Sequence, residues 1–171
     1  MASIRRSVVV SLLFIVFGGP GFLLVYIPYW MTRFHVPAGE PIWQVLVAGV
    51  LILAGLVPLL DSTWRFIFAG RGTLVPAVPT ERLVVTGLYR YVRNPMYVGV
   101  LAVVAGEAIL FRSRGLLGEA LIAALAIHLF VLFYEEPTLM RRHPEDYPIY
   151  REHVPRWLPR LTPWNDSDGP N

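Results

Sequence analysis

At 171 residues, 55% of them hydrophobic and 16% charged, the chain has too few polar side chains to cover a soluble core of this size. Its mean hydropathy of +0.53 suits a protein embedded in lipid. All 15 basic residues are arginine, against 12 acidic ones, and a net charge of +3 in so apolar a chain favours a membrane surface over nucleic acid as partner. Cysteine is absent, which excludes disulfides and thiolate metal sites, and we expect no metal.

Four apolar stretches are each predicted to form a transmembrane helix, because about 20 apolar residues cross a hydrocarbon core of about 30 Å. They cover residues 7–30, 42–60, 95–111 and 116–134. The Gly-Gly-Pro-Gly run at 18–21 should kink the first, and the short third should leave Arg112 and Arg114 snorkelling to the headgroups. We expect an all-α polytopic fold with an interfacial connector and a helical C-terminal segment.

The N-terminus has a second interpretation, a cleaved signal peptide, because Arg5 and Arg6 precede a short apolar run. A retained first helix is favoured, since apolar sequence continues without a small-residue cleavage site to an aromatic cluster at residues 26–30. With both termini cytoplasmic, twelve arginines lie inside and three outside, as the positive-inside rule requires. The expected location is an integral membrane protein of the bacterial cell membrane.

This topology gathers two polar segments at the cytoplasmic face: the connection over residues 70–94 and the tail after residue 134. Asn94 and Pro95 are good N-cap and N1 residues, so the third helix should begin there with its free backbone donors at the interface. Such a helix start attracts anions, and Arg90 and Arg93 add positive charge beside it. The simpler interpretation is that these arginines and Tyr97 only anchor a helix at the interface.

Two adjacent carboxylates, Glu135 and Glu136, close the fourth helix at the membrane boundary. Adjacent carboxylates are seldom placed beside lipid without a partner, and a short turn makes helices three and four antiparallel neighbours. We therefore expect Glu135 and Glu136 near Arg93, Asn94 and Tyr97. The alternative is a purely structural ion pair with Arg90 or Arg93.

Other polar residues of these helices are assigned by position. His128 lies seven residues before Glu135, on roughly the same face, and is either the lining of a polar cavity or a satisfied bundle residue. Glu107 and Glu119 are expected to pair with Arg112 and Arg114 at the turn. Small residues of the third helix, such as Gly99, are expected to pack on the fourth.

The polar segments resemble the membrane methyltransferases that include isoprenylcysteine carboxyl methyltransferases and phosphatidylethanolamine N-methyltransferases. Residues 93–99, Arg-Asn-Pro-Met-Tyr-Val-Gly, look like the carboxyl methyltransferase motif Arg-His-Pro-x-Tyr-x-Gly with asparagine in place of histidine, and Asn-Pro-Met-Tyr matches the phospholipid enzymes. Gly70-Arg71-Gly72 and Glu135-Glu136 look equivalent to the family's cofactor motifs. The tail, with Val-Pro-Arg at 154–156, is similar too, although His143-Pro144 replaces the usual Phe-Gly.

The resemblance implies S-adenosyl-L-methionine as cofactor and a compact helical membrane bundle that encloses it. The cofactor-binding residues it implies are Gly70, Gly72, Arg93, Asn94, Pro95, Tyr97, Gly99, Glu135, Glu136 and Tyr147. The catalytic candidates are Arg156 or Arg90, to hold an acceptor carboxylate, and His128 or Glu136, to deprotonate an acceptor amine.

Three functions remain open from the sequence. The first is O-methylation of a lipid-like or prenylated acceptor that enters from the membrane, and the second is N-methylation of a phospholipid amine. The third is a non-enzymatic membrane scaffold or small transporter. The expected domain is a single membrane methyltransferase domain over residues 1–164 with a disordered tail over 165–171, and the oligomeric state stays open.

Overall fold

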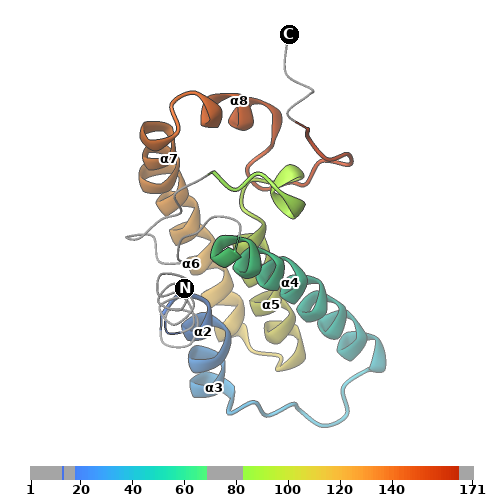
Figure 1. Cartoon of the computed structure of the whole chain (residues 1–171). Coiled ribbons are helices and arrows are strands. Elements are labelled where there is room, and N and C mark those ends of the chain that lie inside the picture. Colours follow the sequence, from blue (N-terminus) through green and yellow to red (C-terminus); the bar gives the residue numbers. More distant parts are fainter. Residues whose placement is uncertain (1–12, 14–17, 69–82, 166–171) are drawn as a thin grey trace.

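The computed structural model describes Leu13, residues 18–68 and residues 83–165, and the described chain is helical without strands. Figure 1 shows the elements in chain order: α2 (Gly19–Gly21), η1 (Phe22–Tyr26), α3 (Ile27–Thr32), α4 (Ile42–Phe68), η2 (Gly87–Arg90), α5 (Pro95–Leu110), α6 (Arg114–Phe130), η3 (Val131–Glu135), α7 (Glu136–Arg142) and α8 (Asp146–His153). Two of them, η1 and η3, are π-helical turns, and η2 is a 3₁₀ turn. The all-α prediction is therefore confirmed.

Within the described residues, two helices are long and apolar enough to cross a membrane: residues 42–66 of α4, and residues 114–142, where α6, η3 and α7 run on as one helix. Helix α5, with 16 residues, is shorter. The four crossings expected from the sequence are thus established only in part. Residues 7–12 and 14–17 of the first predicted span lie outside the described residues, so the signal-peptide alternative is not tested, and the rest of the span is helical from Gly19 onward after the non-helical Gly18.

Helix α4 continues beyond the predicted span end at residue 60, through Pro58 and on to Phe68. An ion pair between Asp61 and Arg65, with 2.8 Å from carboxylate oxygen to Nε, joins residues four apart in its last turns. Arg65 also donates a hydrogen bond to Thr86, 3.1 Å away, just before η2. The cytoplasmic end predicted for α4 is therefore held against the segment that leads into α5.

Helices α4 and α5 approach each other closely through glycine. A Cβ at Gly99 would lie 2.5 Å from the carbonyl oxygen of Gly55, and one at Gly106 would lie 2.9 Å from the carbonyl oxygen of Ala48. The expectation that these glycines pack against the fourth helix is therefore wrong: they face α4. On α6, Gly118 has open space where its side chain would be.

The turn between α5 and α6 corrects a second expectation. Arg112 pairs with Glu40 at 3.0 Å, and neither Glu107 nor Glu119 forms a salt bridge within the described residues. Ser113 caps α6 by accepting a hydrogen bond from the Leu116 amide. Because Glu40 is 72 positions away from Arg112, the local pattern of charges gave no indication of this pair.

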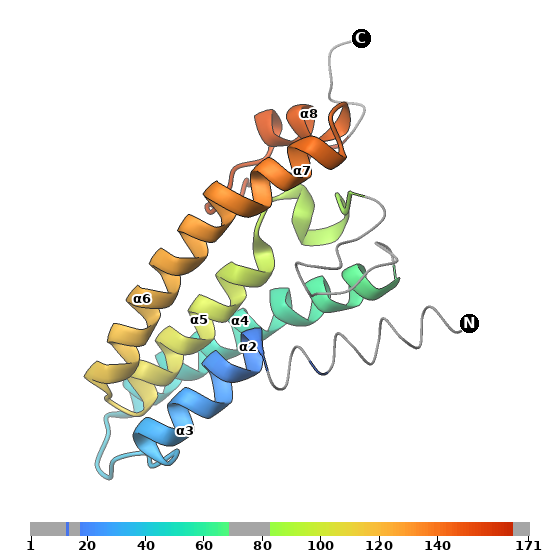
Figure 2. The same cartoon turned by 90° about the vertical axis from the view of Figure 1, so that its left-hand side faces the viewer.

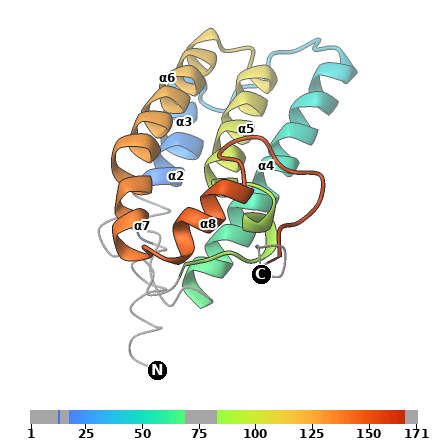
Figure 3. The ribbon, with the colours of Figure 1, turned by 90° about the horizontal axis from the view of Figure 1, so that it is seen from above.

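The bundle has two distinct ends. The α5–α6 turn and the segment between α3 and α4 lie at one end, while η2, α7, α8 and the C-terminal segment lie at the other (Figure 2). At that second end the chain turns after α7, so that α8 runs in a different direction from α7 (Figure 3). Its buried residues Tyr147 and Tyr150 form a cluster with Val154 and Trp164. This end holds the candidate site.

Candidate functional site

Glu136, the first residue of α7, is the centre of a buried charge cluster. Only 5% of the residue is exposed. Arg156 approaches it with both arms of the guanidinium, Nε at 2.6 Å from Oε1 and Nη2 at 2.9 Å from Oε2. Such a two-point pair is among the strongest polar contacts, because both donors match the carboxylate geometry. The hydrogen bond to Glu136 also raises the pKa of Arg156, which keeps the guanidinium charged.

A second arginine completes the cluster. Arg93 donates from Nη1 to Glu136 Oε1 at 2.8 Å and lies 3.4 Å from the Tyr147 hydroxyl. Its side chain is 9% exposed. Its Nε is buried and has no hydrogen-bond partner among the described residues. Burial raises the pKa of the Tyr147 hydroxyl, so this group stays protonated and can donate.

The cluster forms because the C-terminal segment returns along the residues that precede α5. The Arg93 amide donates to the Pro155 carbonyl at 2.9 Å, and the Arg160 amide donates to the Tyr91 carbonyl at 2.9 Å. The Trp164 amide donates to the carbonyl of Arg90, also at 2.9 Å. These three bonds place Arg156 over the start of α5.

Asn94 and Pro95 begin α5 as predicted, but the Asn94 side chain does not cap the helix. Its amide nitrogen donates instead to the Arg156 carbonyl at 3.1 Å. Asn94 therefore ties the returning segment to the helix start. Pro95 is fully buried at the first helical position.

Glu135 lies beside Glu136 but has different partners. The Tyr97 hydroxyl donates to Glu135 Oε2 at 3.0 Å, and both residues are half-buried. Glu135 ends the π-helical turn η3, whose extra residue changes the direction of the following side chains. The predicted proximity of the two glutamates to Arg93 and Tyr97 is thus present, and the predicted structural ion pair is part of it.

Two catalytic candidates are engaged elsewhere. Arg90 donates from Nε to the Trp164 carbonyl at 2.7 Å. The His128 ring accepts a hydrogen bond at Nδ1 from the Trp157 indole at 3.2 Å, and the two ring centres are 5.9 Å apart. Both contacts attach the C-terminal segment to the bundle.

The remaining predicted site residues divide into two groups. Gly99 faces α4. The backbones of α4 and α5 approach so closely there that a residue with a side chain would clash, which explains the glycine. Gly70 and Gly72 lie outside the described residues. Sequence reasoning missed Trp157 and Trp164, which hold the returning segment; their only signal was two tryptophans in an otherwise polar tail.

Long apolar helices that end in a buried cluster of two arginines around one glutamate, with a second glutamate beside it, define a membrane-associated helical protein with a polar site at one end of its bundle. The phospholipid methyltransferase family matches the chain over residues 43–146, and the chain belongs to this family. The match includes α4, α5, α6 and the glutamate pair, and it ends just before Tyr147. No curated protein and no solved structure matches the chain.

Proposed function

We propose that the chain is an S-adenosylmethionine-dependent methyltransferase that methylates a lipid-like acceptor at the end of the bundle where Glu136 lies. The observation that carries the proposal is the buried cluster of Arg93, Glu136 and Arg156, with Glu135 beside it, in a member of a methyltransferase family. Placing several charges at a membrane boundary costs free energy, and such clusters usually mark function. The expected single domain over residues 1–164 and the cytoplasmic position of this end are part of the proposal.

The residues present fit this cofactor. S-adenosylmethionine carries a carboxylate, an ammonium group and ribose hydroxyls, and when bound it supplies an electrophilic methyl group on a sulfonium. Arg93 Nε is a buried donor without a partner, which suits a carboxylate. The helix start at Asn94 and Pro95 adds backbone donors for the same group. The Tyr147 hydroxyl, 3.4 Å from Nη1 of Arg93, adds a further hydrogen-bonding group beside this arginine.

The remaining groups have supporting roles. Glu136 fixes Arg93 and Arg156 through its two oxygens, so the guanidinium of Arg93 is oriented before a ligand arrives. Such preorganisation matters because methyl transfer depends mainly on holding donor and acceptor in line. The C-terminal segment covers the cluster and excludes water from it.

The engagement of the arginines favours an amine as methyl acceptor. An acceptor carboxylate needs a cation to hold it, yet Arg156 is bound to Glu136 and Arg90 to the Trp164 carbonyl. Glu135, in contrast, receives one hydrogen bond, from Tyr97, and is placed to take up the proton that a methylated amine loses. We therefore propose N-methylation of a lipid amine.

O-methylation of a prenylated or other lipid-like carboxylate is the second candidate. The similarity of the Val-Pro-Arg segment at 154–156 to carboxyl methyltransferases supports it, because Arg156 belongs to the cluster. In this case Arg156 would exchange Glu136 for the carboxylate of the acceptor. His128 remains the candidate base only if Trp157 releases it.

Transfer of a radiolabelled methyl group separates these candidates. Purified protein in vesicles of total membrane lipid is incubated with methyl-labelled S-adenosylmethionine, and the extracted lipids are treated with alkali. N-methyl groups survive this treatment, whereas methyl esters release volatile methanol. Alkali-stable label in lipid supports the amine acceptor, and alkali-labile label supports the carboxylate. No label in lipid, with or without bound cofactor, would contradict the proposed function.

A further inference from the structure

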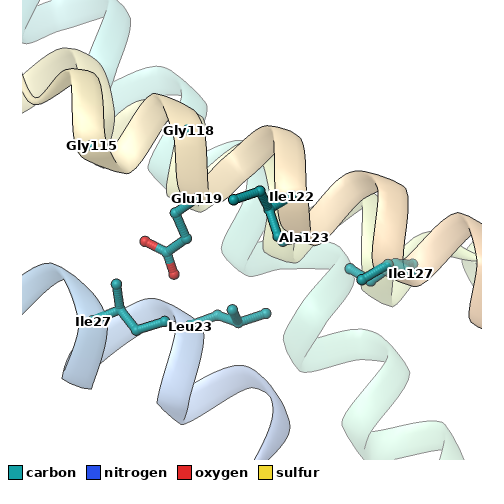
Figure 4. Close-up of a pocket in the computed structure, with 9 residues that line it drawn as sticks. Leu23, Ile27, Gly115, Gly118, Glu119, Ile122, Ala123 and Ile127 are labelled. Atoms are coloured by element: carbon teal, nitrogen blue, oxygen red, sulfur yellow. The ribbon is translucent and has the colours of Figure 1, made fainter.

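A hollow of about 500 Å³ lies between α6 and the segment formed by η1 and α3 (Figure 4). Its volume is within the range of sites that hold small ligands. Its lining is apolar except for one carboxylate, and it consists of Leu23, Ile27, Gly115, Gly118, Glu119, Ile122, Ala123, Ala126 and Ile127. Ile122 is 72% exposed, so the hollow borders the outer surface of the bundle, where lipid would lie.

Glu119 points from α6 into this hollow, toward Leu23 and Ile27 (Figure 4). Both of its carboxylate oxygens are buried and have no hydrogen-bond partner among the described residues. Of the two arginines expected to neutralise Glu107 and Glu119, Arg112 is bound to Glu40, and Arg114 forms no salt bridge with either glutamate within the described residues. Burying an ionisable group without a partner costs free energy. A ligand that donates a hydrogen bond to the Glu119 carboxylate would offset this cost.

A second acidic residue lies at the same end of the bundle. Glu107 of α5 also has a buried oxygen without a hydrogen-bond partner among the described residues, although it does not line the hollow. A carboxylate attracts a cation and repels an anion. A neutral apolar molecule would leave Glu119 unsatisfied.

The order of the lining residues along α6 indicates an elongated ligand. Gly115, Gly118 and Glu119 lie in the first two turns of the helix, near the bilayer surface, and the lining then becomes wholly apolar as far as Ile127. Gly115 and Ile127 are 12 positions apart, which corresponds to about 18 Å of helix. A charged head at Glu119 with an alkyl chain directed toward Ile127 fits this order.

We propose that this hollow binds an amine-bearing membrane lipid, with its ammonium group on Glu119 and its chain along α6. The site is separate from the proposed methyl-transfer site, since Glu119 and Glu136 are 17 residues, or about 25 Å, apart on one continuous helix. The proposal therefore does not depend on the methyltransferase activity.

Photolabelling tests this site. The full chain is purified in an uncharged maltoside detergent and irradiated with dodecylamine that carries a diazirine in its chain, and the labelled peptides are mapped by mass spectrometry. Label should concentrate on residues 23–27 and 122–127. Excess unlabelled dodecylamine should remove it, whereas dodecanol, which lacks the charge, and methylamine, which lacks the chain, should not.

Two variants test the residues that carry the proposal. Glu119→Gln keeps the shape but removes the charge, and Gly118→Leu fills the hollow at a position with no atom within 4 Å of a new Cβ. Each should lower labelling at least about tenfold. Gly49→Leu is the matched control, because Gly49 has the same open space on α4, away from the hollow. Equal competition by dodecanol, or undiminished labelling of either variant, would overturn the proposal.

Discussion

At the scale of single residues, the two neighbouring glutamates have different tasks. Glu136 is buried and bound by two arginines, so it organises the site, whereas Glu135 is half-buried and receives one hydrogen bond from Tyr97. Glu135 is the last residue of the π-helical turn η3, and Glu136 is the first residue of α7. The proposed chemistry depends on this division.

The Tyr97 hydroxyl should matter for turnover more than for cofactor binding. In Tyr97→Phe, Glu135 loses the hydrogen bond that orients it, so kcat for methyl transfer should fall about tenfold or more. Affinity for S-adenosylmethionine, measured by calorimetry, should change less than about twofold, because Arg93 is unaffected.

Tyr26→Phe is the matched control for this change. Tyr26 lies in η1 and is 44% exposed, with no hydrogen bond from its side chain to another described residue. Its variant should retain wild-type kcat. An unchanged kcat in Tyr97→Phe would contradict the proposed role of Glu135 as the proton acceptor.

The candidate site could be predicted from the sequence where its residues are local to the α5–α6 hairpin. Two antiparallel helices bring their ends together, so the proximity of Arg93 to Glu136 and of Tyr97 to Glu135 followed from the short turn. The pairing of Arg156 with Glu136 did not follow, because it depends on a tail that returns through backbone hydrogen bonds of no distinct side-chain pattern. The sequence likewise suggested that the Asn94 side chain caps α5, whereas it donates to the Arg156 carbonyl instead.

At the scale of helices, the contact between α4 and α5 depends on glycine at both sides. Gly99→Ala would place a methyl group 2.5 Å from the Gly55 carbonyl oxygen and 2.9 Å from Pro58, so the helices must separate. We expect a loss of about 1–3 kcal/mol in stability, seen as a lower melting temperature by circular dichroism in detergent.

The control for this prediction is Gly49→Ala, at a position where a new Cβ meets nothing within 4 Å. Alanine there should keep or raise the melting temperature, because alanine favours the helix by roughly 1 kcal/mol over glycine. Equal melting temperatures for the two variants would contradict the observed packing of α4 on α5.

The C-terminal segment should loosen when the anchor at Trp164 is removed. Trp164 is 4% exposed, and its backbone exchanges hydrogen bonds with Arg90. In Trp164→Ala the loss of about 3 kcal/mol of packing should raise the rate of trypsin cleavage after Arg156 and Arg160 at least tenfold. The variant should also bind S-adenosylmethionine more weakly.

Leu158→Ala serves as its control, since Leu158 belongs to the same segment but is 80% exposed. Its cleavage rate should match the wild type. If Trp164→Ala were cleaved no faster than Leu158→Ala, the segment would not be held by this tryptophan.

Helix positions were largely predictable because long apolar runs and strong start signals specify them. The predicted spans over 42–60, 95–111 and 116–134 lie within or close to α4, α5 and the helix that runs through α6 to α7. Which faces meet was less predictable. Gly99 and Gly106 could serve either neighbour of α5, and only the arrangement in space assigns them to α4.

At the scale of the whole molecule, the two ends of the bundle carry different chemistry. One end holds the arginine and glutamate cluster, and the other holds Glu107 and Glu119 near the hollow beside α6. The proposed orientation places the cluster in the cytoplasm, in agreement with the distribution of arginines in the loops.

The absence of cysteine allows this orientation to be measured directly. Single cysteines at the exposed positions Ala38 and Glu152 lie at opposite ends of the bundle. In intact spheroplasts a membrane-impermeant maleimide should label Ala38→Cys but not Glu152→Cys, and lysis should expose both. Labelling of Glu152→Cys in intact spheroplasts would reverse the proposed topology.

The most direct test of the central claim is a calorimetric titration of the purified protein with S-adenosylmethionine, beside Arg93→Gln and the exposed control Arg142→Gln. Glu136 keeps Arg156 as its partner in Arg93→Gln, so this variant should remain folded. The wild type and Arg142→Gln should bind S-adenosylmethionine with equal affinity, and the demethylated product should compete for the same site. Arg93→Gln should bind S-adenosylmethionine at least about tenfold more weakly. No heat with the wild type, or equal affinity in Arg93→Gln, would contradict the cluster as the cofactor site.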